Sequence, residues 1–117
     1  MGIDAGFTPR RHPRVPTILV EDLHHRLKAR QSALVLDVRE RWEYAEGHVP
    51  GARLLPLGEL EERIGELPRD RPVYSICHSG QRSLAAAAFL LAEGFSDVSN
   101  VEGGTSAWIE RGFPVDR

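Results

Sequence analysis

The chain has 117 residues, of which 41% are hydrophobic, and it carries 15 Lys and Arg against 17 Asp and Glu. A chain of this size can build a core without a disulfide or a structural metal, so we expect one domain rather than two. The formal net charge of −2 does not indicate a nucleic-acid partner.

No segment has the length of a membrane span. The longest nearly uninterrupted apolar run, residues 84–92, is far shorter than the roughly 20 residues that cross a bilayer, and no apolar leader follows Met1. The single Cys cannot form an internal disulfide, and its use is typical of a reducing compartment. We therefore expect a cytoplasmic protein without a membrane partner.

Residues 1–16 differ from the rest of the chain. They hold three Pro and three Arg without an apolar period, which predicts an irregular N-terminal tail. We interpret its basic cluster, Arg10, Arg11 and Arg14, as solvated, with contact to a partner as the alternative. The domain is expected to span residues 17–117.

From Thr17 onward, short apolar runs alternate with helical periods. This alternation predicts an α/β fold in which a small parallel sheet is covered by helices on both faces. The expected strands are 18–20, 33–37, 52–55, 73–76 and 97–101.

Helices are expected between these strands, where apolar residues recur at helical spacing. Residues 82–93 read RSLAAAAFLLAE and are apolar on nearly every face, which predicts a helix buried against the sheet and ended by Gly94. Pro68 stops the helix before it. The expected helices are 20–27, 40–46, 57–67, 82–93 and 105–111.

The single cysteine, Cys77, stands between the apolar run VYSI and the predicted buried helix. Ligands of open α/β sheets bind beyond the carboxyl ends of the strands, where this residue is expected. Backbone N–H groups of the turn and the N-terminus of the following helix favour a thiolate and a bound anion there. Gly80 gives the turn conformational freedom and Arg82 adds a fixed cation, so the thiol should be a nucleophile at neutral pH.

The alternative is that Cys77 is a small buried hydrophobic residue at a strand end. The next six positions hold Gly, Gln, Arg and two Ser, which indicates a polar loop and favours the reactive interpretation.

Four segments of the chain resemble single-domain rhodaneses, the thiosulfate-type sulfurtransferases. They are LDVRERWEY (36–44), GHVPGA (47–52), CHSGQRS (77–83) and EGGTSAW (102–108), in the order of the family. The resemblance implies a three-layer α/β fold with a parallel five-stranded sheet, a persulfide on Cys77, and no metal or organic cofactor. It also implies that the substrate is held by the loop residues His78, Ser79, Gly80, Gln81 and Arg82.

Loop length separates two chemistries. Rhodanese-like phosphatases and tyrosine phosphatases place five residues between Cys and Arg, whereas four, residues 78–81, intervene in this chain. The shorter loop should fit a sulfur atom better than a tetrahedral oxyanion, and by analogy with the family it indicates sulfur transfer.

Three polar residues are expected to support the loop without contacting substrate: Asp37, Arg39 and Ser83. Asp37 should accept hydrogen bonds from the loop or pair with Arg82. Equally, it could cap the helix that begins near Glu40.

The remaining His and Trp residues receive structural interpretations. His48 should tie backbone segments together, and the side chain of His78 should point outward. His24 and His25 are expected on the surface, about 100° apart around a helix, where they cannot readily share a metal. The two tryptophans, Trp42 and Trp108, are predicted to pack in the core or at its margin.

These observations predict a sulfurtransferase with a ping-pong mechanism. The donor is thiosulfate or a persulfide, on a small molecule or a protein, and the acceptor is cyanide or a thiol. We expect a monomer or weak homodimer. The alternatives are a non-catalytic rhodanese-like binding or regulatory module, which has no need of the cysteine loop, and an arsenate reductase or phosphatase, which the loop length disfavours.

Overall fold

The computed structural model describes residues 15–117. The predicted tail lies outside the described residues except for Val15 and Pro16, and so does its basic cluster, Arg10, Arg11 and Arg14. Within the described part, the first strand begins at Thr17 and the last helix ends at Glu110.

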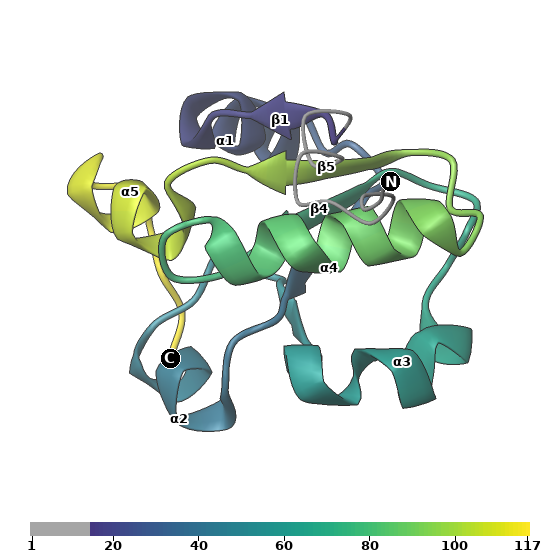
Figure 1. Ribbon diagram of the computed structural model, residues 1–117. Helices are drawn as coiled ribbons and strands as arrows, with labels where there is room; N and C mark the ends of the chain where they lie inside the picture. Colours follow the sequence, from purple (N-terminus) through teal and green to yellow (C-terminus); the bar gives the residue numbers. More distant parts are fainter. Residues whose placement is uncertain (1–14) are drawn as a thin grey trace, which may run out of the picture.

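Five short strands form one sheet, in the order β1-β5-β4-β2-β3 (Figure 1). Each neighbouring pair is parallel, so the predicted parallel five-stranded sheet is confirmed. β4 lies in the centre and is buried along its whole length. The strands are β1 (Thr17–Ile18), β2 (Leu34–Asp37), β3 (Arg53–Leu54), β4 (Val73–Ile76) and β5 (Val98–Val101).

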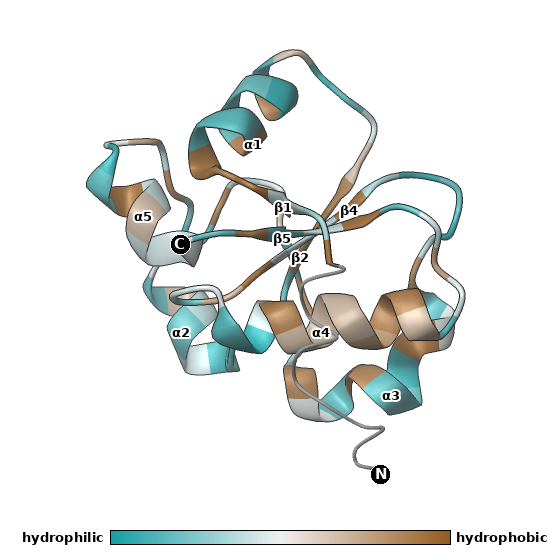
Figure 2. Ribbon diagram, turned by 45° about the horizontal axis from the view of Figure 1, so that its top comes forward, coloured by the Kyte–Doolittle hydropathy of each residue, from teal (hydrophilic) through white to brown (hydrophobic). Residues whose placement is uncertain are grey.

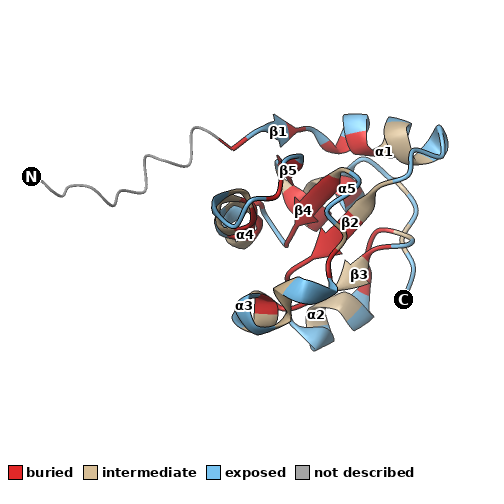
Figure 3. Cartoon of the chain, turned by 90° about the vertical axis from the view of Figure 1, so that its right-hand side faces the viewer, coloured by how far each residue is buried: buried red, intermediate tan, exposed pale blue. Residues whose placement is uncertain are grey.

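Helices cover both faces of the sheet, which confirms the predicted three layers (Figure 3). α3 and α4 pack on one face around Leu36 and Val73, whereas α1 and α5 pack on the other around Val35 and Tyr74. Neighbours in β2 and β4 thus serve different clusters, because successive side chains of a strand point to opposite faces. The helices are α1 (Val20–Lys28), α2 (Arg41–Glu46), α3 (Leu60–Arg63), α4 (Gln81–Ala92) and α5 (Gly104–Glu110).

Two predicted elements differ from the structure by more than one residue at an end. The helix expected over 57–67 is divided into a 3-10 turn (Leu57–Glu59), the single turn α3 and a second 3-10 turn (Ile64–Glu66). Gly58 and Gly65 account for the division, since each disfavours an α-helix by about 1 kcal/mol relative to Ala. β1 ends at Ile18 because α1 already begins at Val20.

The helix after the cysteine loop packs against the sheet, as predicted, although its apolar residues are not all buried. α4 buries Ser83, Ala86, Ala87 and Leu90, whereas Ala85 is exposed. In Figure 2 the helix is nevertheless tan or brown along most of its length. Alanine tolerates this exposure because its small side chain loses little by contact with water.

The two tryptophans have opposite environments. Trp108 is 1% exposed and packs between the sheet and α1, as predicted. The prediction for Trp42 is wrong, since its side chain is 65% exposed. Trp42 stands on α2, which has six residues and buries none of them fully.

Among the helices of residues 15–117, none combines the length and the apolar character that crossing a bilayer requires.

Candidate active site

Cys77 lies directly after β4, at the carboxyl end of the central strand, where the loop to α4 begins. Gly80 precedes α4 with a φ of +109°, and its backbone N–H donates a hydrogen bond to Cys77 Sγ over 3.1 Å. The Ser83 hydroxyl lies 3.3 Å from the same sulfur. The loop thus closes around the thiol, which is 1% exposed.

Burial and hydrogen bonds shift the pKa of Cys77 in opposite directions. Burial raises the pKa of the thiol, because it disfavours the charged form. Hydrogen bonds from the Ser83 hydroxyl and from backbone N–H groups of the loop outweigh burial and hold the pKa of Cys77 below its ordinary value. The predicted activation of the thiol therefore has a geometric basis.

The loop is held in place from behind by α5. The backbone N–H of Thr105 donates to Cys77 O over 2.8 Å, and that of Ser106 donates to His78 O over 3.0 Å. The preceding Gly104 is so close that a Cβ there would lie 2.5 Å from Cys77 O. Only glycine permits this approach, which explains the second Gly of the EGGTSAW segment.

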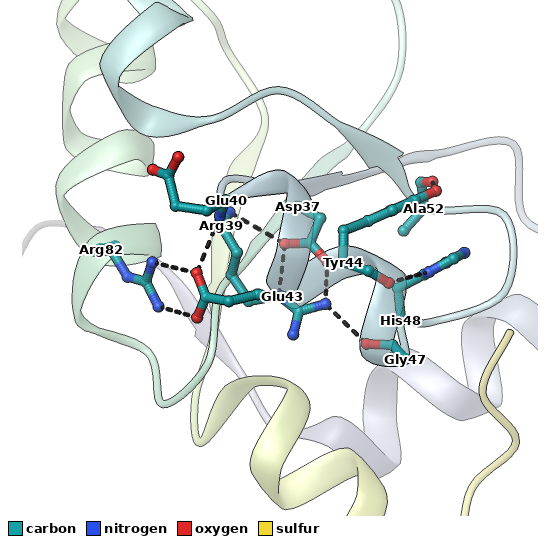
Figure 4. A network of polar contacts seen from close by, with 9 residues as sticks. All are labelled: Asp37, Arg39, Glu40, Glu43, Tyr44, Gly47, His48, Ala52 and Arg82. Carbon is teal, nitrogen blue, oxygen red and sulfur yellow. Dashed lines mark hydrogen bonds and ion pairs between the residues drawn. The ribbon is translucent and has the colours of Figure 1, made fainter. Parts of the chain in front are cut away.

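Arg82 has a partner that the sequence analysis did not identify. Its Nη1 and Nη2 donate to the two carboxylate oxygens of Glu43 over 2.8 and 2.9 Å (Figure 4). Hydrogen bonds from Arg82 lower the pKa of Glu43 from 4.5 to about 2. The guanidinium expected beside the thiol is therefore held in an ion pair with Glu43.

The predicted pairing of Asp37 with Arg82 is wrong. Asp37 accepts from Arg39, with Nε to Oδ1 at 2.9 Å and Nη2 to Oδ2 at 2.8 Å (Figure 4). Both side chains are buried, and Arg39 Nη2 also donates to the carbonyl of Gly47 over 2.9 Å. The alternative that Asp37 caps α2 is also wrong, since Glu40 is the N-cap residue. Asp37 and Arg39 thus join the end of β2 to the turn after α2.

The histidines follow most of their predictions. His78 is exposed, as expected. His48 ties backbone segments together: its Nδ1 lies 2.8 Å from Tyr44 O, and its backbone forms a bridge with Asp116. The prediction that His24 lies on the surface is wrong, because its ring is half-buried and stacks on Phe113 with centroids 4.0 Å apart.

A pocket of about 410 Å³ opens beside the cysteine loop, between α2 and α5. The exposed side chains of Trp42 and Ile109 belong to its wall, as does the Glu43–Arg82 pair. The buried Thr105 also lines it, and among the described residues the Thr105 hydroxyl is the buried side-chain group without a hydrogen-bond partner. The remaining lining residues are Arg39, Glu46, Gly47, His78 and Ser106.

Asn100 is a further residue that the sequence analysis missed. It stands in β5, beside β4, and is 6% exposed. Its Oδ1 lies 2.6 Å from Ser83 Oγ, and its Nδ2 donates to Gly80 O over 3.2 Å. The sequence signal that could have identified Asn100 is a polar residue within a strand that was expected to be buried.

Within residues 15–117, no three His, Cys, Asp or Glu side chains gather in a group that could hold a metal ion.

This chain matches one protein-family model and is similar to several known proteins. The family model described as the Rhodanese-like domain matches residues 19–111. The thiosulfate sulfurtransferase GlpE of Pseudomonas putida is 38% identical over 82 residues, which cover 70% of this chain and 74% of that protein. The putative sulfur carrier protein YrkF of Bacillus subtilis is 42% identical over 94 residues, or 80% of this chain, but this match spans about half of YrkF (51%).

A solved structure agrees with these matches. The crystal structure of a rhodanese-related protein from Thermoplasma volcanium superposes with a TM-score of 0.77 and 39% sequence identity. The superposition covers 86% of this chain and 97% of that protein.

Proposed function

The chain belongs to the family of rhodanese-like domains, and on this basis we propose that it is a sulfurtransferase that carries one sulfur atom as a persulfide of Cys77. The observation that carries the proposal is the buried Cys77 Sγ, which accepts a hydrogen bond from the Gly80 N–H at the carboxyl end of the central strand. A residue with only a packing role has no need of a loop of donors around its sulfur.

In the first half-reaction, the Cys77 thiolate attacks the outer sulfur of thiosulfate or of a persulfide donor. A bond forms between Sγ and this sulfur while the donor's own S–S bond breaks. The electron pair of that bond leaves with sulfite or with the donor thiolate. The negative charge of the thiolate then resides on the terminal sulfur of the Cys77 persulfide, and no external oxidant is needed.

In the second half-reaction, an acceptor such as cyanide or a thiolate attacks the terminal sulfur. The Sγ–S bond breaks and its electron pair returns to Sγ, so Cys77 leaves as a thiolate. Backbone N–H groups of the loop and the N-terminus of α4 stabilise the negative charge in both steps. The acceptor approaches through the pocket between α2 and α5.

We assign a role to each residue of the cysteine loop from its position relative to Cys77 and the pocket. Ser79, Gly80 and Gln81 hold the terminal sulfur through the backbone, while His78 contacts the acceptor at the entrance. Arg82 acts from within its ion pair with Glu43, which fixes the guanidinium at the wall of the pocket.

Intact mass measurement tests the persulfide. Incubation with thiosulfate and no acceptor should add the mass of one sulfur atom, and cyanide should remove it with release of thiocyanate. Cys77 is the only cysteine, so Cys77→Ser should abolish both loading and transfer. The circular dichroism spectrum of Cys77→Ser should match that of the unmodified protein, which separates a chemical role from a packing role.

Two results would overturn the proposal. If neither thiosulfate nor a low-molecular-weight persulfide loads Cys77, the domain is a binding module. If the protein hydrolyses aryl phosphates efficiently, the four-residue loop does not exclude tetrahedral oxyanions.

A further inference from the structure

The hydroxyl of Ser83 faces two acceptors with one hydrogen. Its Oγ lies 2.6 Å from Asn100 Oδ1 and 3.3 Å from Cys77 Sγ, and Ser83 is fully buried. A serine hydroxyl donates one hydrogen bond and accepts two. At any moment, therefore, it can donate either to Asn100 or to Cys77.

The amide of Asn100 has its orientation imposed by the loop. Its Nδ2 donates to the carbonyl oxygen of Gly80 over 3.2 Å. With the amide reversed, its oxygen would face that carbonyl, and neither group could donate. The backbone of Ser83 is fixed as well, because its carbonyl accepts a hydrogen bond from Ser75 Oγ over 3.0 Å. Asn100 Oδ1 is thus held as an acceptor towards Ser83.

From this geometry we propose that Asn100 is a positioning residue for sulfur transfer, which holds the Ser83 hydrogen while Cys77 Sγ is neutral and yields it when Sγ becomes charged. The inference rests on the proposed function for its role in the reaction, but the hydrogen-bond exchange itself needs only the thiol and the thiolate.

The protonation state of Cys77 decides which acceptor is used. A neutral thiol can donate its own hydrogen to Ser83 Oγ, and Ser83 then donates to Asn100 over the shorter distance. A thiolate has no hydrogen to give and accepts strongly, so the hydroxyl turns about its C–O bond towards Sγ. Asn100 Oδ1 then loses this donor.

The same exchange accompanies the discharge of the persulfide. Sγ is neutral in the persulfide, so the hydrogen stays with Asn100. When the acceptor breaks the Sγ–S bond, an electron pair moves onto Sγ and the hydroxyl turns towards it. This hydrogen bond strengthens as the charge develops, so it stabilises the transition state more than the persulfide.

Other ionisable side chains lie near the cysteine loop, but they do not take part in the exchange. Arg82 of α4 is paired with Glu43 of α2, and His78 is exposed beside the thiol. From the end of β2, Arg39 reaches the same pocket while it is paired with Asp37. All five remain in place in the variants below, so differences between the variants report on Ser83 and Asn100.

A double-mutant cycle on the Cys77 thiol tests the proposal. The pH midpoint of alkylation by iodoacetamide is measured for the unmodified protein, Asn100→Leu, Ser83→Ala and the double variant. Asn100→Leu frees the Ser83 hydrogen for Sγ and should lower the midpoint by about half a unit, whereas Ser83→Ala removes the donor and should raise it by about one unit. In the Ser83→Ala background, Asn100→Leu should no longer lower the midpoint.

Two outcomes would contradict the exchange. If Asn100→Leu raises the midpoint equally in both backgrounds, Asn100 acts only through its bond to Gly80. If it leaves the midpoint unchanged in both, Asn100 does not compete for the hydrogen. The assay needs no sulfur donor, so a failure of sulfur transfer would count against the proposed function and not against this result.

A measurement on the unmodified protein covers the case in which Asn100→Leu does not fold. The side-chain carbonyl carbon of Asn100 should shift in the NMR spectrum with the same midpoint as Cys77 alkylation, in the direction of a lost hydrogen bond. The shift should be absent in Cys77→Ser. A resonance that does not follow Cys77 in the unmodified protein would overturn the proposal.

Discussion

Replacing Gly104 by Ala tests how tightly α5 is fitted to the cysteine loop. Gly104 has a φ of +60°, and a Cβ there would lie 2.5 Å from Cys77 O and 2.6 Å from His78 O. Both distances are well below the roughly 3.3 Å at which a carbon and an oxygen normally meet. Helix and loop must therefore separate by roughly 0.8 Å to relieve the closer contact.

The separation weakens the two hydrogen bonds that anchor the loop, from Thr105 N–H to Cys77 O and from Ser106 N–H to His78 O. Each contributes about 1 kcal/mol to stability. The left-handed backbone of residue 104 adds about 1 kcal/mol against Ala. We expect Gly104→Ala to lower the free energy of unfolding by about 3 kcal/mol.

Gly112→Ala is the matched control. Gly112 has a φ of +75°, but a Cβ at this position would meet no heavy atom within 4 Å, so its replacement should lower stability only by the backbone contribution of about 1 kcal/mol. Urea unfolding followed by circular dichroism measures both variants. If they lose the same stability, α5 is not held at contact distance from the loop, and the reasoning is refuted.

Three further predictions concern the polar groups around the loop. Glu43→Gln should lower the free energy of unfolding at pH 7 by about 1 kcal/mol, because the partly exposed Arg82 lets solvent screen the pair. The pKa of Glu43 is lowered from 4.5 to about 2, so the difference between the two proteins should be full above pH 4.5 and disappear as the pH falls through about 2; a difference that persists in stronger acid would assign it to another cause. Asp37→Ala should lower the free energy of unfolding by about 3 kcal/mol or more in urea, whereas Asp37→Leu combined with Arg39→Met should lower it less, and a larger loss in the double variant would contradict the pairing. Thr105→Val removes a buried hydroxyl without a partner and should raise the free energy of unfolding by about 1 kcal/mol; a clear loss of stability would mean that the hydroxyl is bonded.

The architecture was predictable because it depends on local patterns. An apolar run bounded by polar residues predicted β4 at 73–76, and the structure has it at those residues. The same logic located α4 and α5 to within one residue at each end, since helical spacing and flanking Gly act over short stretches of chain. The cysteine loop followed from its place between such a strand and such a helix.

The side-chain partners around the loop were not predictable in the same way. Glu43 meets Arg82 across 39 positions of the sequence, and this contact depends on how α2 is placed against α4. Asp37 and Arg82 were expected at the same end of the sheet, which suggested that they pair. Arg39 is only two residues from Asp37 in the sequence, and its guanidinium binds the Asp37 carboxylate instead. The burial of Trp42 was predicted wrongly because a helix of six residues is too short for its apolar period to show which side faces the core.

The burial of the only cysteine also affects how the purified protein behaves in air. A disulfide between two copies requires their Cβ atoms to come within about 4 Å of each other. Cys77 is 1% exposed behind its own loop, so two copies cannot meet this requirement without unfolding that loop. Non-reducing gels should therefore show a single monomer band even after long storage without reductant. Thiol reagents should react in order of size, with small alkylating agents ahead of bulky fluorescent maleimides.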